Sequence, residues 1–243
     1  MTAVIRVAQL RKQFGAILAL EDMTLDIDAG EVVALVGDNG AGKSTVVRCL
    51  AGLCVPTAGQ IMLDGATVRF AHPGDARRHG IEVVLQELAL ADRQPVYMNV
   101  FLGRELVRRP AHRLDRRGMA AATQRLLESL EVRVDSPHKI VRELSGGQRQ
   151  AVAIARAVHW AKRVVLMDEP TASLGATETQ RVEELIGRLR ERGTAILVVS
   201  HSLDQVFRIA DRICVLRRGR QIGVRTASET TAEEILAMIT GLA

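Results

Sequence analysis

The run GDNGAGKST at residues 37–45 constrains this chain more than any other feature. Gly37 is followed, after four residues, by Gly42, Lys43 and Ser44, which is the spacing of a phosphate-binding loop. The preceding run EVVALVG is apolar and β-branched, as a buried strand is, and the following run KSTVVRCLAGL has apolar residues at helical spacing. The sequence therefore predicts the strand–loop–helix unit in which such a loop works.

The residue types in this loop indicate a nucleoside triphosphate as ligand. Glycines let the backbone turn tightly and direct N–H groups at phosphate oxygens, and the start of the following helix adds a dipole that favours anions. We expect Lys43 to reach the β- and γ-phosphates, Ser44 to bind Mg²⁺ and Thr45 to assist at the α-phosphate. An ordinary glycine-rich turn is the competing interpretation, and it explains the complete pattern less well. The other loop positions expected to contact nucleotide are Asp38, Asn39, Gly40 and Ala41.

A second apolar run, RVVLMDEP at residues 163–170, ends in two acids. Ligands of open α/β sheets gather at the carboxyl ends of the strands, so these acids are predicted to lie beside the phosphate loop. Asp168 suits the Mg²⁺ shell, and Glu169 is expected to point differently, toward an attacking water. An acidic strand end that only caps a turn is the alternative, and the neighbouring phosphate loop argues against it.

Residues 144–148 read LSGGQ and precede the amphipathic run RQAVAIARAV. Ser145 is predicted to cap this helix, and the glycines allow an anion to approach its start. A simple Ser-Gly-Gly turn would not explain a second anion site in one chain. With the two motifs above, LSGGQ resembles the signature of ATP-binding subunits of ABC transporters. The resemblance implies that the signature closes on ATP held by another copy or by a related subunit, giving two composite sites. The signature residues carried over are Ser145, Gly146, Gly147 and Gln148.

Three further positions match that family in order. Gln86, in VVLQE, corresponds to the glutamine that senses Mg²⁺ and the attacking water, and His201, in VVSHS, to the histidine that contacts the γ-phosphate. Phe14 stands where an aromatic ring stacks on adenine. Each has a plainer interpretation: an exposed loop glutamine, a structural histidine after a strand, and a core phenylalanine.

The chain departs from the family pattern at one position. Many ABC ATPases have Asp where PTASLGATET places Gly175, and that Asp usually helps to join the two sites of the dimer. The form with Gly resembles monosaccharide importers of the ribose, xylose and fructose type. The runs FLGREL at 101–106 and EEILAMITG near the end resemble the same subgroup.

The predicted fold class is α/β: a P-loop NTPase (RecA-like) core with an antiparallel β part and an inserted α-helical subdomain. One ABC-type domain spans 1–243, with 1–86 and 163–243 as the nucleotide-binding core and 87–162 as the helical subdomain. The runs VIRVAQL, MTLDIDAG and GQIMLDGATV predict the antiparallel strands, and RICVLRRGRQIG a strand–turn–strand. ADRQPVYMNVFLGRELVRR and MAAATQRLLESLEV are interpreted as helices, as is TTAEEILAMITG near the end.

Bulk properties favour a globular protein without a membrane span of its own. No run reaches the roughly 18 apolar residues of a transmembrane helix, and no signal peptide is evident, so we expect a cytoplasmic protein that lies peripherally on the inner face of the membrane. The net charge is +5, and the arginine clusters are scattered, which favours solvated faces and no nucleic-acid partner; the alternative is a diffuse basic surface that binds DNA weakly.

The leading hypothesis is an ATPase subunit, with ATP and Mg²⁺ as cofactors, that energises an ABC importer for a monosaccharide. Its partners would be a second ATPase copy or a paired subunit, integral membrane permease subunits contacted through 87–107, and indirectly a periplasmic or extracellular solute-binding protein. The alternative is a soluble ABC-type ATPase in DNA repair or translation, which usually needs a coiled coil or two fused units. A module that holds ATP without turnover is disfavoured by Glu169 and His201, and a P-loop kinase would not need LSGGQ.

Overall fold

The computed structural model describes residues 3–108, 110, 112–172 and 174–242. Its strands are β1 (Ile5–Phe14), β2 (Ile17–Ile27), β3 (Val32–Val36), β4 (Ala58–Leu63), β5 (Ala66–Val68), β6 (Ile81–Val84), β7 (Val107–Arg108), β8 (Arg113–Leu114), β9 (Val164–Asp168), β10 (Ala195–Val199), β11 (Arg212–Arg217) and β12 (Arg220–Thr226). Its α-helices are α1 (Lys43–Leu50), α2 (Pro73–Arg78), α3 (Val96–Val100), α4 (Arg116–Ser129), α5 (Gly146–Trp160), α6 (Ala176–Glu191), α7 (Leu203–Ile209) and α8 (Ala232–Thr240).

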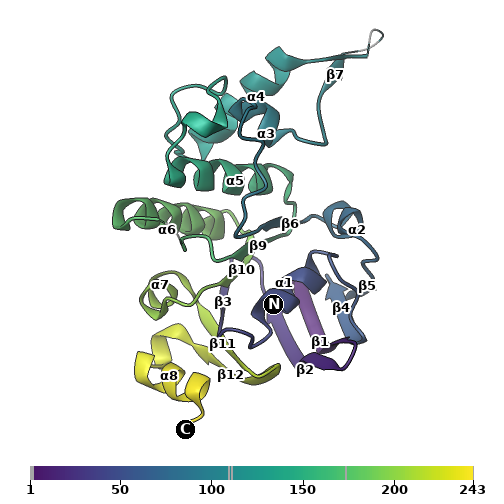
Figure 1. Ribbon diagram of the computed structural model, residues 1–243, viewed down its shortest axis with the longest axis vertical. Coiled ribbons are helices and arrows are strands. Elements are labelled where there is room, and N and C mark those ends of the chain that lie inside the picture. The colour runs from purple at the N-terminus through teal and green to yellow at the C-terminus, as the bar shows by residue number, and fades with distance from the viewer. Residues whose placement is uncertain (1–2, 109, 111, 173, 243) are drawn as a thin grey trace.

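A ten-stranded mixed sheet runs through the lower part of the molecule, in the order β5-β4-β1-β2-β12-β11-β3-β10-β9-β6 (Figure 1). The five strands from β11 to β6 are parallel to one another. Every residue of β3 and of β10 is buried. Parallel strands covered on both faces show continuous apolar runs without alternation, which explains why every residue in VVALV and AILVV is apolar. Helices α1 and α6 therefore have apolar surface to cover on opposite sides of one central sheet.

The antiparallel part consists of β1, β2, β4 and β5, drawn in purple and blue (Figure 1). It joins the parallel part where Arg220 of β12 pairs with Asp22 of β2. Residues of β1 that face the core alternate with exposed ones at its start, as a sheet with one solvated face requires. The predicted α/β fold with an antiparallel β part is thus confirmed, including the strand–turn–strand at β11 and β12.

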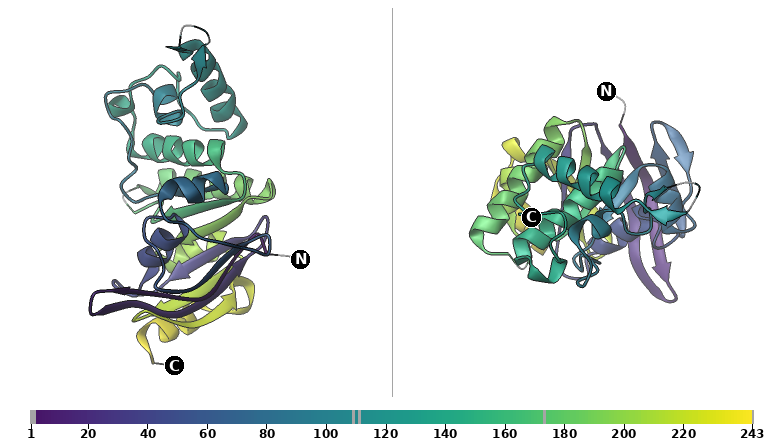
Figure 2. Two further views of the ribbon diagram at one scale, coloured as in Figure 1. Left: turned by 90° about the vertical axis from the view of Figure 1, so that its right-hand side faces the viewer. Right: turned by 90° about the horizontal axis from the view of Figure 1, so that it is seen from above.

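Helices α3, α4 and α5 form a layer stacked on the β6 end of the sheet, far from the antiparallel strands (Figures 1 and 2). Buried side chains of this layer, such as Met119, Val141 and Ile154, share one hydrophobic cluster with Met167 of β9. The prediction of a helix over MAAATQRLLESLEV is confirmed by α4, whose N-cap Asp115 accepts a hydrogen bond from the Gly118 N–H.

The prediction of a helix over ADRQPVYMNVFLGRELVRR was wrong for most of that run. Only Val96–Val100 is helical. Pro95 precedes this turn in an extended conformation, and Gly103 adopts a left-handed φ of 76°, which ends helical continuation. The chain then enters β7, which pairs with β8 in a small antiparallel hairpin that the sequence analysis did not anticipate.

Within the described ranges, no helix combines the length and the apolar character that crossing a bilayer requires. The last helix, α8, begins as its sequence predicted, because the Thr231 hydroxyl caps it by accepting a hydrogen bond from the Glu234 N–H. Gly241 ends it with a left-handed φ of 83°.

Candidate nucleotide site

Four parallel strands end at the same edge of the sheet and bring the predicted site residues together. Gly37 follows β3 and Glu169 follows β9, while His201 and Gln86 each stand two residues beyond the ends of β10 and β6. All four residues line one cavity of about 610 Å³. The other residues that line it are Val36, Asp38, Asn39, Ser200, Leu203, Leu236 and Ile239. The carboxyl edge of the sheet is therefore the candidate site, as the topology of open α/β sheets predicts.

Two positions in the phosphate loop admit only glycine. Gly37 has a φ of +149°, and a Cβ there would lie 2.1 Å from the carbonyl oxygen of Leu216. Gly42 has a φ of +107°, and its Cβ would lie 2.7 Å from the carbonyl oxygen of Ala19. The loop is thus pressed against two neighbouring backbones.

Lys43 is held inside the loop that it follows. Its side chain is buried, and Nζ donates hydrogen bonds to the carbonyl oxygens of Gly37 at 2.6 Å and Asp38 at 2.9 Å. Burial lowers the pKa of the ammonium group, although the charges of Glu169 and Asp168 oppose that shift. The ammonium group therefore sits beneath the loop, where the terminal phosphates are expected, and can exchange a carbonyl partner for a phosphate oxygen.

The Ser44 hydroxyl and the Asp168 carboxylate lie next to each other beside the loop and form a hydrogen bond. Burial raises the pKa of the Asp168 carboxyl, and a hydrogen bond with the Ser44 hydroxyl acts in the opposite direction. A desolvated carboxylate next to a hydroxyl is an unfavourable arrangement that a hard cation would relieve. Thr45 is half-buried in the first turn of α1.

His201 and Glu169 face each other at the cavity wall, with Nδ1 of the histidine 3.5 Å from Oε1 of the glutamate. Glu169 adopts a left-handed φ of 50°, which is uncommon outside glycine, while its N–H donates to the Val199 carbonyl oxygen at 3.0 Å. Such strain costs of order 1–3 kcal/mol and concentrates at functional positions. The backbone therefore turns sharply after Asp168, so that the two neighbouring acids point in different directions.

Ser200 is a supporting residue that sequence reasoning missed. Its hydroxyl donates to Gln205 Oε1 at 3.0 Å and accepts a hydrogen bond from the Ser202 N–H at 3.1 Å. Thr171, which follows the acids, donates to the same Gln205 oxygen at 3.0 Å. Gln205 thus ties the turn after β9 to the turn after β10. Only the folded chain brings these segments together, so no local pattern marked them.

Phe14 lies at the end of β1, where its side chain is 44% exposed, and so it is not a core residue. Lys12 Nζ stands 4.7 Å from the centroid of the ring and also donates to the Val55 carbonyl oxygen at 2.7 Å. An exposed aromatic ring held by a cation–π contact is suited to stacking on a planar ligand. Lys12 was not anticipated from the sequence.

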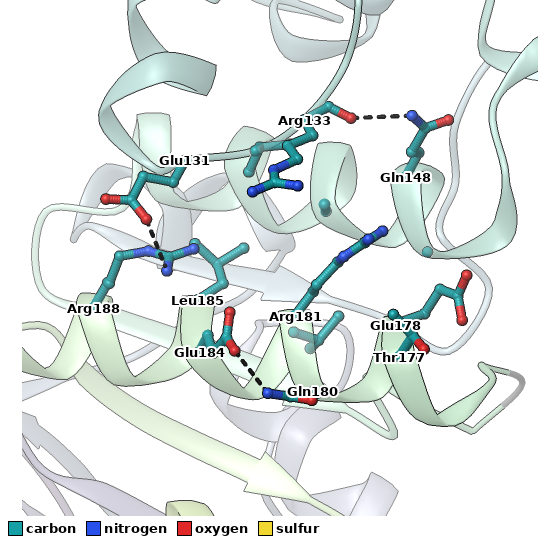
Figure 3. Close-up of a pocket in the computed structure, with 14 residues that line it drawn as sticks. Glu131, Arg133, Gln148, Thr177, Glu178, Gln180, Arg181, Glu184, Leu185 and Arg188 are labelled. Carbon is teal, nitrogen blue, oxygen red and sulfur yellow. Dashed lines mark hydrogen bonds and ion pairs between the residues drawn. The ribbon is translucent and has the colours of Figure 1, made fainter.

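The signature run forms the start of α5 and has a complete capping box. The Gln148 N–H donates to Ser145 Oγ at 3.2 Å, and the Ser145 N–H donates to Gln148 Oε1 at 3.1 Å. Gly146 and Gly147 occupy the first turn. Among the described residues that line the Glu169–His201 cavity, none belongs to this run. Gly147 and Gln148 instead line a separate cleft of about 330 Å³ between α5 and α6 (Figure 3). One chain therefore keeps the signature apart from its own phosphate loop.

Comparison with protein-family models matches residues 20–172 to the model described as "ABC transporter". The chain belongs to the ABC transporter family. The matched range includes the phosphate loop, Gln86, the signature and both acids. This confirms the resemblance predicted from those motifs and the prediction of an ABC-type ATPase.

Curated relatives extend the similarity over the whole chain. It is 42% identical to the xylose/arabinose import ATP-binding protein XylG of Sulfolobus acidocaldarius, over 100% of this chain and 96% of that protein. It is 41% identical to the fructose import ATP-binding protein FrcA of Rhizobium meliloti, over 96% of this chain and 92% of that protein. The ribose import ATP-binding protein RbsA 2 of Streptomyces avermitilis is 40% identical over 98% of this chain, which spans 47% of that longer protein.

Solved structures of ATP-binding cassettes share the fold. The structure of cbiO1 from Clostridium perfringens, described as part of the ABC transporter complex cbiONQ, superposes with a TM-score of 0.82 at 26% identity and covers 100% of this chain and 96% of its own. The dimeric structure of MJ0796, described as a bacterial ABC transporter cassette, has a TM-score of 0.77 at 25% identity and covers 92% of this chain and 98% of its own.

Proposed function

We propose that this cassette hydrolyses ATP to energise the import of a monosaccharide. The observation that carries the proposal is the convergence of Gly37, Gln86, Glu169 and His201 on one cavity, with Lys43 held beneath its loop. The named relatives act in import of xylose or arabinose, fructose and ribose, and they support the sugar assignment. None of these relatives is a DNA-repair or translation protein, so nothing favours that alternative.

Each residue has a chemical role in this proposal. Glu169 accepts a proton from the attacking water, and His201, across 3.5 Å, contacts the γ-phosphate and keeps the carboxylate oriented. Lys43 stabilises charge on the transferring phosphoryl group, because phosphoryl transfer depends mainly on positioning and electrostatics. Gln86 orients the water from the end of β6. The exposed ring of Phe14 stacks on adenine.

The oxygen donors around Asp168 fit Mg²⁺. Asp168, the Ser44 hydroxyl and the Gln86 amide oxygen are the hard ligands that this ion takes, and burial of the Asp168 carboxyl makes a cation favourable there. When bound, Mg²⁺ would neutralise charge on the β- and γ-phosphates. Asp168 and Ser44 would hold it, and Gln86 would report its presence to the attacking water.

The signature run of one chain would complete the nucleotide site of a second chain when the two associate. Because the start of α5 lies on a different cleft from the phosphate loop, Ser145 and Gly147 would act on ATP held by another copy or a related subunit. The dimeric MJ0796 cassette gives precedent for association of such domains. Two sites around a two-fold axis follow from this arrangement.

The helical layer carries the proposed contact with the permease. Segment 87–107 begins directly after Gln86 and ends at the first residue of the β7–β8 hairpin, and Leu102, Leu106 and Val107 in its last part are exposed. Exposed apolar side chains in the segment that follows a nucleotide-sensing residue suit a partner that must respond to ATP binding. Through this contact the cassette would lie on the inner face of the membrane, with a solute-binding protein on the other side of the permease.

A substitution at the phosphate loop tests the ATPase assignment. Lys43→Ala should remove MgATP hydrolysis and the rise in melting temperature that bound MgATP gives, because the loop loses its buried cation. Lys162→Ala, at an exposed lysine after α5, is the matched control and should keep both. Equal hydrolysis by the two variants would refute the phosphate-loop assignment.

A pull-down from membranes tests the transport assignment. A tagged cassette should co-purify with its permease, and polar substitutions at Leu102 and Leu106 should weaken that recovery while nucleotide binding persists. Loss of both together would count against a coupling role for 87–107. Uptake of labelled xylose, fructose and ribose in a strain lacking this subunit then identifies the sugar, and unchanged uptake of all three would remove the monosaccharide assignment.

A further inference from the structure

Glu178 lies across the starts of two helices. It stands in the first turn of α6, whose N-cap is Gly175. A Cβ on Gly175 would lie 3.0 Å from Glu178 Oε2, and a Cβ on Gly147 would lie 2.3 Å from Glu178 Cγ. The methylene groups of this side chain thus occupy the space beside the signature glycine, and its carboxylate lies beside the glycine that caps α6.

The surroundings of Glu178 favour an anion. The first turn of a helix leaves backbone N–H groups without helical partners and carries partial positive charge, and here one side chain lies against the starts of both α5 and α6, with its carboxylate at the α6 cap. Figure 3 shows Glu178 and Arg181 rising from α6 into the cleft below Gln148, with Arg133 reaching down from the opposite wall. Glu178 itself is half-buried there.

Gly175 and Glu178 are matched to each other. Because Gly175 has no side chain, the carboxylate of Glu178 can fold back to within contact distance of the α6 cap. An aspartate at 175 would place both a Cβ and a second negative charge in that space. Gly175, which stands where many family members have Asp, is therefore matched by Glu178 about one turn later in α6.

We propose that Glu178 is an affinity-determining residue of the signature half-site: it is an internal anion at the start of α5, and it weakens the capture of the γ-phosphate of ATP held by a partner copy. The inference rests on the pairing proposed above. A phosphate approaching Ser145 and Gly147 meets the negative charge of Glu178, whose half-buried side chain packs against Gly147 from the neighbouring helix α6, and the two like charges repel. ATP-driven closure would therefore bring a phosphate to a helix start against which the methylene groups of Glu178 already pack, with its carboxylate close by at Gly175.

The test compares two glutamate substitutions on one helix. In a Glu169→Gln background, which should slow turnover strongly, Glu178→Gln removes the charge and keeps the shape of the side chain. Glu184→Gln is the control, because Glu184 lines the same cleft about 9 Å further along α6. Dimer formation is followed by size-exclusion chromatography with light scattering during an ATP titration.

Glu178→Gln should dimerise at an ATP concentration about two- to fivefold lower than the parent, the range that a charge at a helix start gives, and Glu184→Gln should match the parent. Raising the salt concentration should narrow the difference in ATP concentration between Glu178→Gln and the parent, because salt screens the repulsion that the parent retains. Glu178→Ala should show the same gain as Glu178→Gln.

Other outcomes separate the two proposals. If the Glu169→Gln parent dimerises with ATP but Glu178→Gln shifts nothing, the role of Glu178 is wrong and the pairing stands. If only Glu178→Ala changes the titration, the side chain acts through packing, and the inference is again wrong. If the parent stays monomeric with ATP even with its membrane partner, the pairing itself is refuted, and the inference with it.

Discussion

His201 Nδ1 lies 3.5 Å from Glu169 Oε1, and the two residues reach this distance because their strands are parallel neighbours. Val199 of β10 pairs with Asp168 of β9, so both strands end at the same height. The turns that follow then place a carboxylate and an imidazole on one cavity wall. The His201 side chain is 61% exposed, which leaves room for a phosphate between the ring and the loop.

Glu169→Gln should lower the rate of ATP hydrolysis by about 10²–10⁴-fold while MgATP still binds, because the amide keeps the shape of the side chain and cannot accept the proton of water. Phosphate release measures the first quantity, and the shift in melting temperature with MgATP measures the second. Glu191→Gln, at the exposed end of α6, is the control and should hydrolyse ATP as the unaltered protein does. Hydrolysis by Glu169→Gln within tenfold of the control would assign the base to another group.

The two signature glycines should respond differently to alanine. At Gly147 a Cβ would lie 2.3 Å from Glu178 Cγ and 2.8 Å from its Cβ, so α5 and α6 must separate. We expect Gly147→Ala to lose about 1–3 kcal/mol of folding stability, or roughly 2–12 °C in Tm. At Gly146 the nearest atom is Leu174 Cδ2 at 3.6 Å, an ordinary contact. Gly146→Ala should therefore melt at the same temperature as the parent or slightly above it, since alanine favours helix.

Thermal melts of the two variants without nucleotide give the comparison. Adding Glu178→Ala to Gly147→Ala removes the closest overlap and should recover part of the lost stability. If Gly147→Ala and Gly146→Ala melt together, the close approach of Glu178 to the signature helix is not present in solution.

The sequence was sufficient for features that are local. The phosphate loop, Asp168, Glu169 and the signature each combine a contiguous motif with a strand or helix whose periodicity is plain, and the structure brings the first three together because parallel strands share an edge. The helix predicted across 91–109 failed because its apolar spacing could not reveal that Gly103 would turn left-handed and that β7 would find β8.

The sequence was insufficient for contacts between distant segments. Lys12 and Phe14 show no motif, and their use depends on β1 ending in solvent beside Val55. Gln205 joins two turns only after β9 and β10 pair. Glu178 reads as an ordinary acid in the first turn of a helix, and its position against Gly147 follows from how α5 crosses α6. Packing, rather than local propensity, decides each of these cases.

Asp168→Asn should stabilise the nucleotide-free protein at pH 7 and abolish hydrolysis. Burial raises the pKa of this carboxyl above its ordinary value of 3.8, so the charged form present at pH 7 disfavours folding. Because the folded-state pKa is raised, stability is greatest below the unfolded value and is lost as the pH rises through the folded one. The asparagine variant avoids that loss, and each 1 kcal/mol relieved raises Tm by roughly 2–4 °C.

Melting curves between pH 3.5 and pH 8 measure this effect. The advantage of Asp168→Asn should be largest at neutral pH, shrink as the pH falls toward 3.8, and vanish below that value, where the aspartate is protonated in the folded and the unfolded state alike. Addition of MgATP should raise Tm of the unaltered protein more than that of the variant, because the amide is a poorer ligand for a hard cation. An Asp168→Asn protein that melts below the parent at pH 7 would show that the carboxylate is stabilised in the fold.

Phe14→Ala should weaken ATP binding without unfolding the protein. The ring is 44% exposed and contributes little to the core, so its loss should leave Tm nearly unchanged. Stacking of a base on an aromatic side chain is worth about 1–3 kcal/mol, which corresponds to roughly a 5- to 150-fold rise in KM for ATP with kcat preserved. Steady-state kinetics measure both constants.

Ile17→Ala removes a side chain that is 70% exposed from the facing strand and should leave KM unaltered. Because stacking reads the face of a base and not its edge, GTP should suffer a similar loss, whereas a loss confined to ATP would mean that Phe14 helps to recognise the adenine edge.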